Sequence, residues 1–373
     1  MVLRERVGVC EEEEHVITVG VDAHKQVHAA VALDDAGREV GRWRGPNSAR
    51  GWAELREWAT QWSTPRQWGI EGAWNYGRGL AQHLVVAGES AYEINPRWTA
   101  QRRRSARRPG KSDALDATAV ALLVWREAAT LPRVAAEDET GVLDLLVTER
   151  EGALTEATRL RNQVHQLLLQ LDPEYRVHLP SLLSEPGVVA LEQYAAPGPG
   201  RLDQERAAAV RRLAQRLRLA LTQAEDLAAQ IRARTRARFA PLTRLCGVSL
   251  LTAGALAGIL GPGHRFRTDA QLAAYAGAAP LEASSAGRER HRLNRGGNRR
   301  LNAILYRIAL TQARASDEAK AYLARREAGG TSRREAIRAL KRFLVRAIWR
   351  LWQECVRATP EAPRGTLPAS AAA

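Results

Sequence analysis

Three segments of the sequence carry four carboxylates at points where a predicted strand ends or a predicted helix begins. The apolar run before Asp22, in VGVDAHK, predicts a strand that ends at this residue, and the run before Glu71, in WGIEGAW, predicts a second. Asp113 and Asp116, in KSDALDATA, lie three residues apart at the start of a predicted helix over 112–127, so both point from one face of its first turn. Burial in a hydrophobic core does not explain acidic residues at these positions, so they indicate a functional site.

Four converging carboxylates would repel one another unless cations lay between them. Hard divalent cations prefer carboxylate oxygens, so the set predicts a nuclease-type two-metal site that holds Mg²⁺ or Mn²⁺. Each acid alone has a simpler explanation, because the helix dipole favours an acid in a first turn and a strand end can be solvated. The repeated context favours the site, with the following residues as both metal ligands and catalytic groups: Asp22, Glu71, Asp113 and Asp116.

The first part of the chain alternates predicted strands with predicted helices. Strands over 16–22, 27–33 and 39–43 precede a helix for which Ser48 is the expected cap. The strand before Glu71, a helix over 80–86, a strand over 91–94 and the helix with the aspartate pair complete the order. Three strands followed by alternating helices and strands is the α/β order of a ribonuclease H-like domain.

The middle of the chain has a different, all-helical pattern. Apolar residues at alternating spacings of three and four predict two long helices with coiled-coil seams. The two helices are predicted to be separated by a segment between Asp172 and Arg201, in which several prolines break the helix. The two helices could pack as an antiparallel hairpin within one chain or each could pair with a second subunit, and the spacing leaves both open. The seam residues are Ala157, Leu160, Val164, Leu167 and Leu171, then Val210, Leu213, Leu217, Ala220, Ala224, Leu227 and Ile231.

The last third is also predicted to be mostly helical. Helices are expected from Leu250, over 269–276, over 301–312 and after a capping box from Ser332 to Glu335. The predicted organisation is therefore an acidic tail over 1–14, an α/β catalytic domain over 15–130, a coiled-coil region over 131–236, a C-terminal domain over 237–357 and a disordered tail over 358–373.

The net charge of +15 over 373 residues indicates a polyanionic partner. Two clusters contribute much of it, and arginine suits bidentate phosphate contacts and guanine edges. Either cluster alone could be a solvated loop, but each adjoins a candidate catalytic segment, which favours binding of DNA or RNA. The clusters are Arg102, Arg103, Arg104, Arg107, Arg108 and Lys111, and Arg288, Arg290, Arg292, Arg295, Arg299 and Arg300.

The cysteines and the apolar segments point to a cytoplasmic protein. The three cysteines are scattered and form no CxxC, which argues against a disulfide framework and against a zinc site. The N-terminal segment carries the acidic run Glu11–Glu14 instead of a hydrophobic signal region, and the longest uncharged stretch, 245–263, is rich in glycine. No membrane partner is expected.

The motifs in this order resemble the DEDD transposases of bacterial insertion sequences, the group that includes Piv-type DNA invertases. The resemblance rests on GVDAHK, IEGA and KSDALDA, then on LAAYAGAAPLEASSAG and RGGNRRLNAILY, and covers about residues 15–315. It implies a RuvC-like domain whose four acids hold magnesium, and a second domain with a nucleophilic serine. That serine aligns with Ser285, and Ser284 is the alternative. The family usually has glycine directly after the serine, but Ala286 precedes Gly287 here, so the loop is less free to adopt positive φ.

The resemblance implies a DNA transposase or recombinase that cuts and rejoins strands of donor and target DNA through a phosphoserine intermediate. A homo-oligomer, dimer or tetramer, is expected, and because an element-encoded bridge RNA directs some members, a guide RNA is a further expected partner. Two alternatives stay open. One is a metal-dependent Holliday-junction resolvase or nuclease with water as nucleophile, and the other is a nucleic-acid-binding protein that has lost catalysis.

Overall fold

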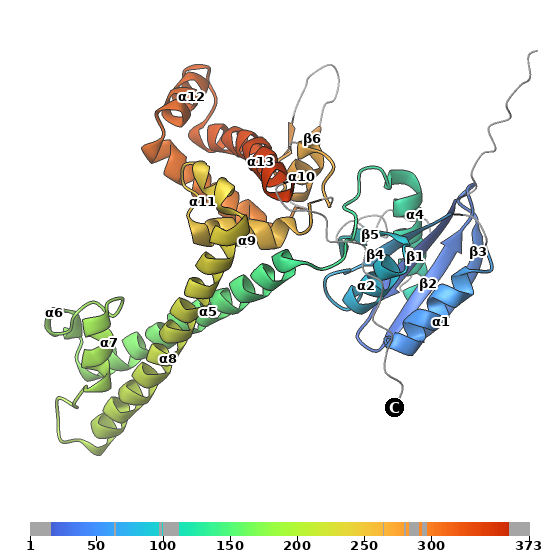
Figure 1. Ribbon diagram of the computed structural model, residues 1–373. Coiled ribbons are helices and arrows are strands. Elements are labelled where there is room, and N and C mark those ends of the chain that lie inside the picture. Colours follow the sequence, from blue (N-terminus) through green and yellow to red (C-terminus); the bar gives the residue numbers. More distant parts are fainter. Residues whose placement is uncertain are drawn as a thin grey trace, which may run out of the picture. The chain divides into compact units, whose positions relative to one another are not determined.

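The computed structural model describes residues 16–62, 65–96, 99, 112–263, 265–279 and 297–357, with the backbone of 281–282 and 291–292. It divides into two compact units (Figure 1). The first comprises the chain up to Glu137 with Pro262–Ala303 and Arg338–Trp349, and the second comprises Asp138–Gly261, Ile304–Ile337 and the chain from Arg350. The predicted tails, 1–14 and 358–373, lie outside the described residues.

The first unit contains a five-stranded mixed sheet. Strands β1 and β2, and β2 and β3, pair antiparallel, whereas β4 runs parallel to both β1 and β5. This connectivity agrees with the predicted element order and is compatible with a ribonuclease H-like domain. The order of the strands across the sheet is β3-β2-β1-β4-β5. Along the chain, the strands are β1 (Ile17–Ala23), β2 (Val27–Leu33), β3 (Glu39–Pro46), β4 (Arg66–Glu71) and β5 (Ser90–Ile94).

Helices cover both faces of this sheet. Helices α1 (Ala49–Ala59) and α2 (Arg78–Val86) share one hydrophobic cluster with the side chains of alternate β1 residues. Helix α4 (Asp113–Glu127) packs on the opposite face, where Val31 and Leu33 of β2 contact its Ala117 and Ala121. The predicted caps are confirmed, because Ser48 accepts a hydrogen bond from Gly51 and begins α1.

Two glycines allow α4 to lie directly on the sheet. Gly20 of β1 and Gly69 of β4 are paired neighbours in the parallel ladder. A Cβ at Gly20 would lie 2.2 Å from the backbone nitrogen of Ala121, and one at Gly69 would lie 2.4 Å from Cγ2 of Val124. Since no other residue fits this close approach, the glycine pair fixes the depth and the position of the helix.

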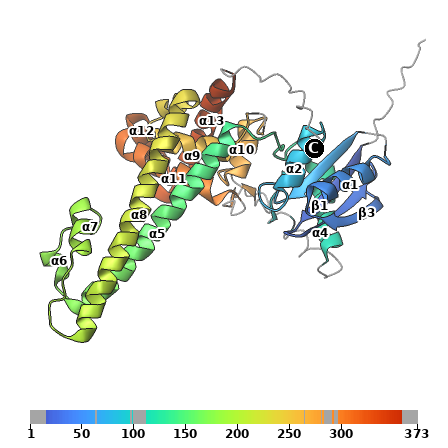
Figure 2. The ribbon, with the colours of Figure 1, turned by 60° about the horizontal axis from the view of Figure 1, so that its bottom comes forward.

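The second unit is built on two long helices, α5 (Glu139–Leu171) and α8 (Arg201–Arg238), which lie side by side (Figures 1 and 2). Arg234 near the end of α8 pairs with Glu139 at the start of α5, and Arg216 pairs with Glu156, so the helices are antiparallel. The structure thus has the intrachain hairpin, one of the two arrangements that the spacing left open. Leu168 is buried in place of the predicted Leu167 and Leu171, which are partly buried, because the apolar face drifts around a straight helix.

The proline-rich segment between these helices is not simply a break. It contains α6 (Tyr175–His178) and α7 (Glu185–Glu192), and Pro186 lies in the first turn of α7. The two long helices are interrupted over this segment as predicted, and Pro186 forfeits no helical hydrogen bond because it lies at the start of a separate short helix. Ser184 caps the helix by accepting from Gly187.

The remaining elements are mostly the helices that the sequence predicts. A helix over 317–328 was missed, and its start is marked by Ser316, whose hydroxyl accepts from Ala319. In the described residues, no helix is long and apolar enough to cross a membrane. The elements are η1 (Ala240–Arg244), α9 (Leu250–Leu260), α10 (Asp269–Tyr275), β6 (Leu281–Glu282), β7 (His291–Arg292), α11 (Arg299–Ala315), α12 (Asp317–Ala328) and α13 (Arg333–Arg357).

Candidate active site

Two of the predicted acids stand at the carboxyl end of neighbouring strands. Asp22 of β1 lies two residues beyond Gly20, and Glu71 of β4 lies two residues beyond Gly69. Since side chains alternate along a strand, both acids point to the sheet face on which α4 packs. The register pairs Val21 with Ile70, so Asp22 and Glu71 occupy the next position along the two strands.

The first turn of α4 brings the other two acids to the same face. Ser112 caps the helix by accepting a hydrogen bond from the Leu115 nitrogen at 3.3 Å. Asp116, next to the Ala117 that packs on the sheet, is 5% exposed, whereas the Asp113 side chain is 45% exposed. The glycine pair in the sheet therefore positions both aspartates at the carboxyl edge.

A histidine that the sequence analysis did not single out joins the acids. Nε2 of His24 lies 3.0 Å from Oδ2 of Asp22 and 3.7 Å from Oδ1 of Asp113. Asn47 holds the turn that carries His24, because its amide donates to the carbonyl oxygens of His24 and Lys25, each at 3.3 Å. The available signal was its place in VGVDAHK, two residues after the first acid.

The electrostatics of the site centre on Asp22. Burial raises the pKa of its carboxyl above the ordinary value; His24 opposes this shift, while the negative charges of Asp116 and Asp113 add to it. A divalent cation would relieve this repulsion, and carboxylate oxygens with imidazole nitrogen form a suitable donor set for one. Among the described residues, donor atoms of Asp22, His24 and Asp113 all lie within 4.8 Å of one another. This group could bind a metal.

Glu71 and Asp116 lie outside that compact group of three donors. One oxygen of Glu71 accepts a hydrogen bond from the Thr99 hydroxyl at 3.0 Å, which orients its carboxylate. The structure therefore places all four predicted acids at one edge of the sheet and gathers two of them, with His24, at the spacing of metal ligands.

The remaining predicted site residues are described only in part. Ser284 and Ser285 lie outside the described residues. So do Arg288, Arg290, Arg295 and the whole first basic cluster from Arg102 to Lys111, and only the backbone of Arg292, in β7, is described. Arg299, which is exposed, and Arg300, which is half-buried, lie in the first turn of α11.

The two ends of the segment that contains the predicted serines lie against each other. A Cβ at Gly297 would be 2.2 Å from the Gly277 nitrogen, and Gly277 itself has a φ of 64°. Asn302 of α11 donates its amide to the Ala276 carbonyl oxygen at 2.7 Å. Backbone contact between two glycines thus closes the base of this segment, which explains the glycine in the GGNRR motif.

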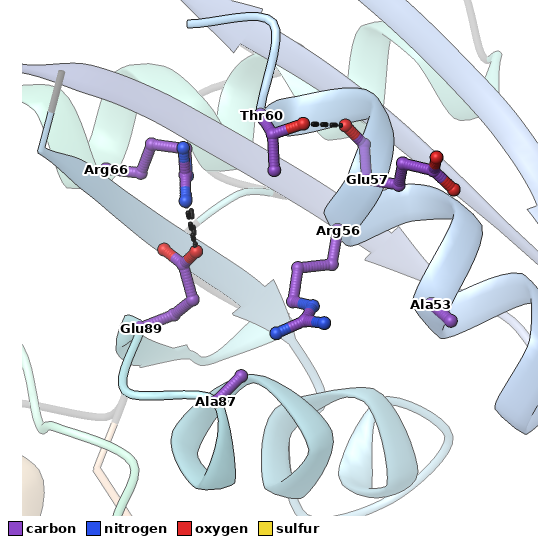
Figure 3. Close-up of a pocket in the computed structure, with 7 residues that line it drawn as sticks. All are labelled: Ala53, Arg56, Glu57, Thr60, Arg66, Ala87 and Glu89. Atoms are coloured by element: carbon purple, nitrogen blue, oxygen red, sulfur yellow. Dashed lines mark hydrogen bonds and ion pairs between the residues drawn. The ribbon is translucent and has the colours of Figure 1, made fainter. Parts of the chain in front are cut away.

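A pocket at the opposite edge of the sheet is not part of this site (Figure 3). Arg66 and Glu89, at the starts of β4 and β5, form an ion pair of 2.6 Å on its wall. Glu89 also accepts from the Trp68 indole at 2.9 Å. These matched charges stabilise the unit, and the carboxyl edge remains the candidate site.

Two acids at the carboxyl edge of this sheet and two in the first turn of the helix packed on it form a group that could bind a metal, an arrangement compatible with a nucleic-acid enzyme of the DEDD type. Comparison with known proteins agrees. A model of the IS110 DEDD transposase domain, described as a transposase, matches residues 19–173, and a model described as transposase of the IS116/IS110/IS902 family matches residues 239–324. The chain therefore belongs to the IS110/IS116 family and is a DNA transposase.

Two full-length relatives come from insertion elements of Streptomyces. An uncharacterized 43.6 kDa protein of insertion element IS110, from Streptomyces coelicolor, is 29% identical over 92% of this chain and 96% of its own length. An uncharacterized 44.8 kDa protein of insertion element IS116, from Streptomyces clavuligerus, is 25% identical over 93% and 97%.

Proposed function

We propose that this transposase cuts and rejoins DNA with a RuvC-like carboxylate site that holds Mg²⁺ or Mn²⁺ and a serine that carries the cut strand. The observation that supports the metal site best is the buried Asp22 carboxylate, which His24 contacts and whose pKa is raised by burial and by the two aspartates of α4. Asp22, His24 and Asp113 would be the closest ligands, with Glu71 and Asp116 completing the site. The bound cation would supply Lewis-acid stabilisation of negative charge on the phosphate.

The serine half of the proposal rests on the family motif. The Ser285 oxygen would form a bond to phosphorus while the bond from phosphorus to a deoxyribose oxygen breaks. The serine proton would leave to a base, and the released sugar oxygen would gain one. A second strand's hydroxyl would reverse these steps and release Ser285. The glycine contact at residues 277 and 297 supports this role, because it gives the segment between them a fixed base.

The assembly is also proposed. The arginine clusters would bind donor and target DNA, and a bridge RNA would select them, in an oligomer of two or four chains. The domains would follow the predicted boundaries, with the helical region over 131–236 serving as a coiled coil and the region over 237–357 as the serine domain.

The experiment that tests the chemistry is a search for a covalent protein–DNA adduct. The protein is expressed with its native flanking DNA, denatured and digested, and nucleotide-modified peptides are mapped by mass spectrometry. We expect the adduct on Ser285 and its loss in Ser285→Ala, while the matched variant Ser284→Ala retains it. Metal-dependent cleavage that persists in Ser285→Ala without any adduct would overturn the serine mechanism and favour a nuclease that uses water.

A further inference from the structure

We propose that Arg44 is a phosphate-binding residue of the carboxylate site, whose guanidinium contacts the DNA phosphodiester that is cut there. This inference rests on the proposed function, since it assumes that DNA enters at the carboxyl edge of the sheet. Arg44 adds a positively charged side chain to that edge. It lies on β3, the strand farthest from Glu71 in the sheet, and belongs to none of the sequence motifs.

The sheet register places Arg44 in the same row as the catalytic acids. Asp22 of β1 pairs with Ala29 of β2, and Ala29 pairs with Arg44 of β3. Paired residues of adjacent strands point to the same face, so Arg44 points to the face of Asp22 at a distance of two strand spacings, about 10 Å between backbones. Ala29 between them is small and buried, so no long side chain stands between Asp22 and Arg44 in this row.

The reach of the side chain brings its charge to the site. Nη2 of Arg44 lies 3.8 Å from Oδ2 of Asp113, on the carboxylate whose other oxygen faces His24 at 3.7 Å. Within the part of the chain that the structure describes, this is the guanidinium's one polar contact, and it is longer than a hydrogen bond. The side chain is 68% exposed, so its five N–H donors are available to a ligand.

A neighbouring arginine differs from Arg44 in that its charge is already paired within its own strand. Arg42 lies on the same strand and the same face, but its guanidinium donates two hydrogen bonds to Glu39. Its charge is therefore neutralised within β3, whereas the partner of Arg44 is an acid of the proposed metal site. When that acid binds a cation, its negative charge is shared with the metal, and Arg44 is left to pair with another anion.

A phosphate is the anion that this geometry fits. A phosphodiester bound beside Asp22 and Asp113 would lie within reach of the Arg44 guanidinium, whose Nη2 is 3.8 Å from Oδ2 of Asp113. A guanidinium offers paired donors that match phosphate oxygens, and such charge-assisted bonds strengthen as charge builds up during strand transfer.

The test compares Arg44→Gln with the matched control Arg42→Gln in two assays. The first measures binding of a short fluorescent duplex from the element's own end as a function of salt, with Ca²⁺ in place of the active metal. The second measures Mn²⁺-dependent cleavage at saturating DNA. We expect Arg44→Gln, but not Arg42→Gln, to make the plot of log affinity against log salt less steep by about 0.9, the change for one lost phosphate contact. Turnover of Arg44→Gln should fall about 10- to 100-fold, and Arg44→Lys should recover part of it.

Two results would overturn the inference. Equal behaviour of the two variants would show that Arg44 makes no special contact. Lower turnover of Arg44→Gln with an unchanged salt slope would show that Arg44 makes no phosphate contact and only holds Asp113 in place. Failure of the proposed function itself would look different, because cleavage by the native protein would then be insensitive to Asp22→Asn.

Discussion

The sheet of the first unit and the helical hairpin of the second handle charge in opposite ways. Along α5 and α8 exposed charges are matched, as where Arg216 of α8 pairs with Glu156 of α5. At the carboxyl edge of the sheet, by contrast, Asp22 is buried beside two further acids, and its pKa is raised by that burial. The ion pairs of the hairpin thus match charge with charge, while the sheet edge keeps an unfavourable concentration of negative charge that a bound cation would relieve.

The largest expected effect comes from removing charge at the sheet edge. Asp22→Asn keeps the shape of the side chain but removes the buried anion that would bind the metal. We expect DNA cleavage and rejoining to fall about a thousandfold or more, because no neighbouring group replaces a lost ligand. The measurement is strand cleavage of the element's own end in Mg²⁺ and in Mn²⁺.

The matched control for this variant lies in the hairpin. Glu156→Gln also removes one carboxylate, but Glu156 is exposed and pairs with Arg216. Its activity should stay within about twofold of the native protein, since exposed ion pairs contribute little. Equal losses in both variants would contradict the distinction between the two regions.

The second prediction compares a buried arginine with an exposed one. Arg265 in the first unit is 4% exposed. Its Nη2 lies 2.5 Å from a carboxylate oxygen of Glu93 and donates a hydrogen bond to the Tyr275 hydroxyl at 2.9 Å. Arg265→Met should lower the free energy of unfolding by about 3–5 kcal/mol, because it leaves the largely buried Glu93 carboxylate without its cation. Arg216→Met in the hairpin should cost about 1 kcal/mol or less, because Arg216 and its partner Glu156 are both exposed. Urea denaturation measures both, and similar losses would contradict the comparison.

The third prediction compares glycine-to-alanine substitutions in the two regions, which should change the stability of the fold in opposite directions. Gly20→Ala places a methyl group against the backbone of α4 and should destabilise by about 1–3 kcal/mol. Gly152→Ala in α5 meets no atom within 4 Å and should stabilise by about 0.5–1 kcal/mol, because alanine is the better helix former. Melting temperatures of the two variants check this, and a stabilising Gly20→Ala would show that α4 does not rest on the sheet as described.

The smallest expected effect is a pH dependence of stability. The raised pKa of Asp22 means that the folded protein binds more protons than the unfolded chain between pH 3.8 and the folded-state pKa. Stability therefore falls as the pH rises through this window, and the loss persists at neutral pH without metal. Asp22→Asn should be more stable than the native protein by about 1 kcal/mol at neutral pH in EDTA, with the advantage lost below about pH 4.

The control for this pH effect has the opposite sign. Hydrogen bonds from the Arg38 backbone and side chain lower the pKa of Asp34, so its charge stabilises the fold above pH 3.8 and this contribution is lost as the pH falls through the folded-state pKa. Asp34→Asn should lower the melting temperature at neutral pH. A pH-independent difference for Asp22→Asn would contradict the account of its burial.

The sequence predicted the order of strands and helices and the four acids because both depend on local patterns. Strand alternation, the Ser48 and Ser112 caps and the capping box at Ser332 are each readable within a few residues. The parallel pairing of β1 and β4 was not predicted, although it is compatible with the ribonuclease H-like order of elements. The missed helix over 317–328 had the same kind of signal in its cap at Ser316.

The contribution of His24 and Arg44 could not be predicted in the same way. His24 reaches Asp22 only because Asn47, on a distant segment, fixes the turn between β1 and β2. Arg44 joins the site through the register of three strands, and one residue of slippage would have turned it to the other face. Such contacts depend on tertiary pairing, which no local pattern in a single sequence specifies.

The measurement that tests the account most directly is calorimetric titration of Mn²⁺ into the native protein and into Asp22→Asn, with Glu156→Gln as control. We expect saturable binding to the native protein and to the control, and its loss in Asp22→Asn even though that variant is folded and at least as stable. Equal Mn²⁺ binding by all three proteins would contradict the claim that the carboxyl edge of the sheet is the metal site of this transposase.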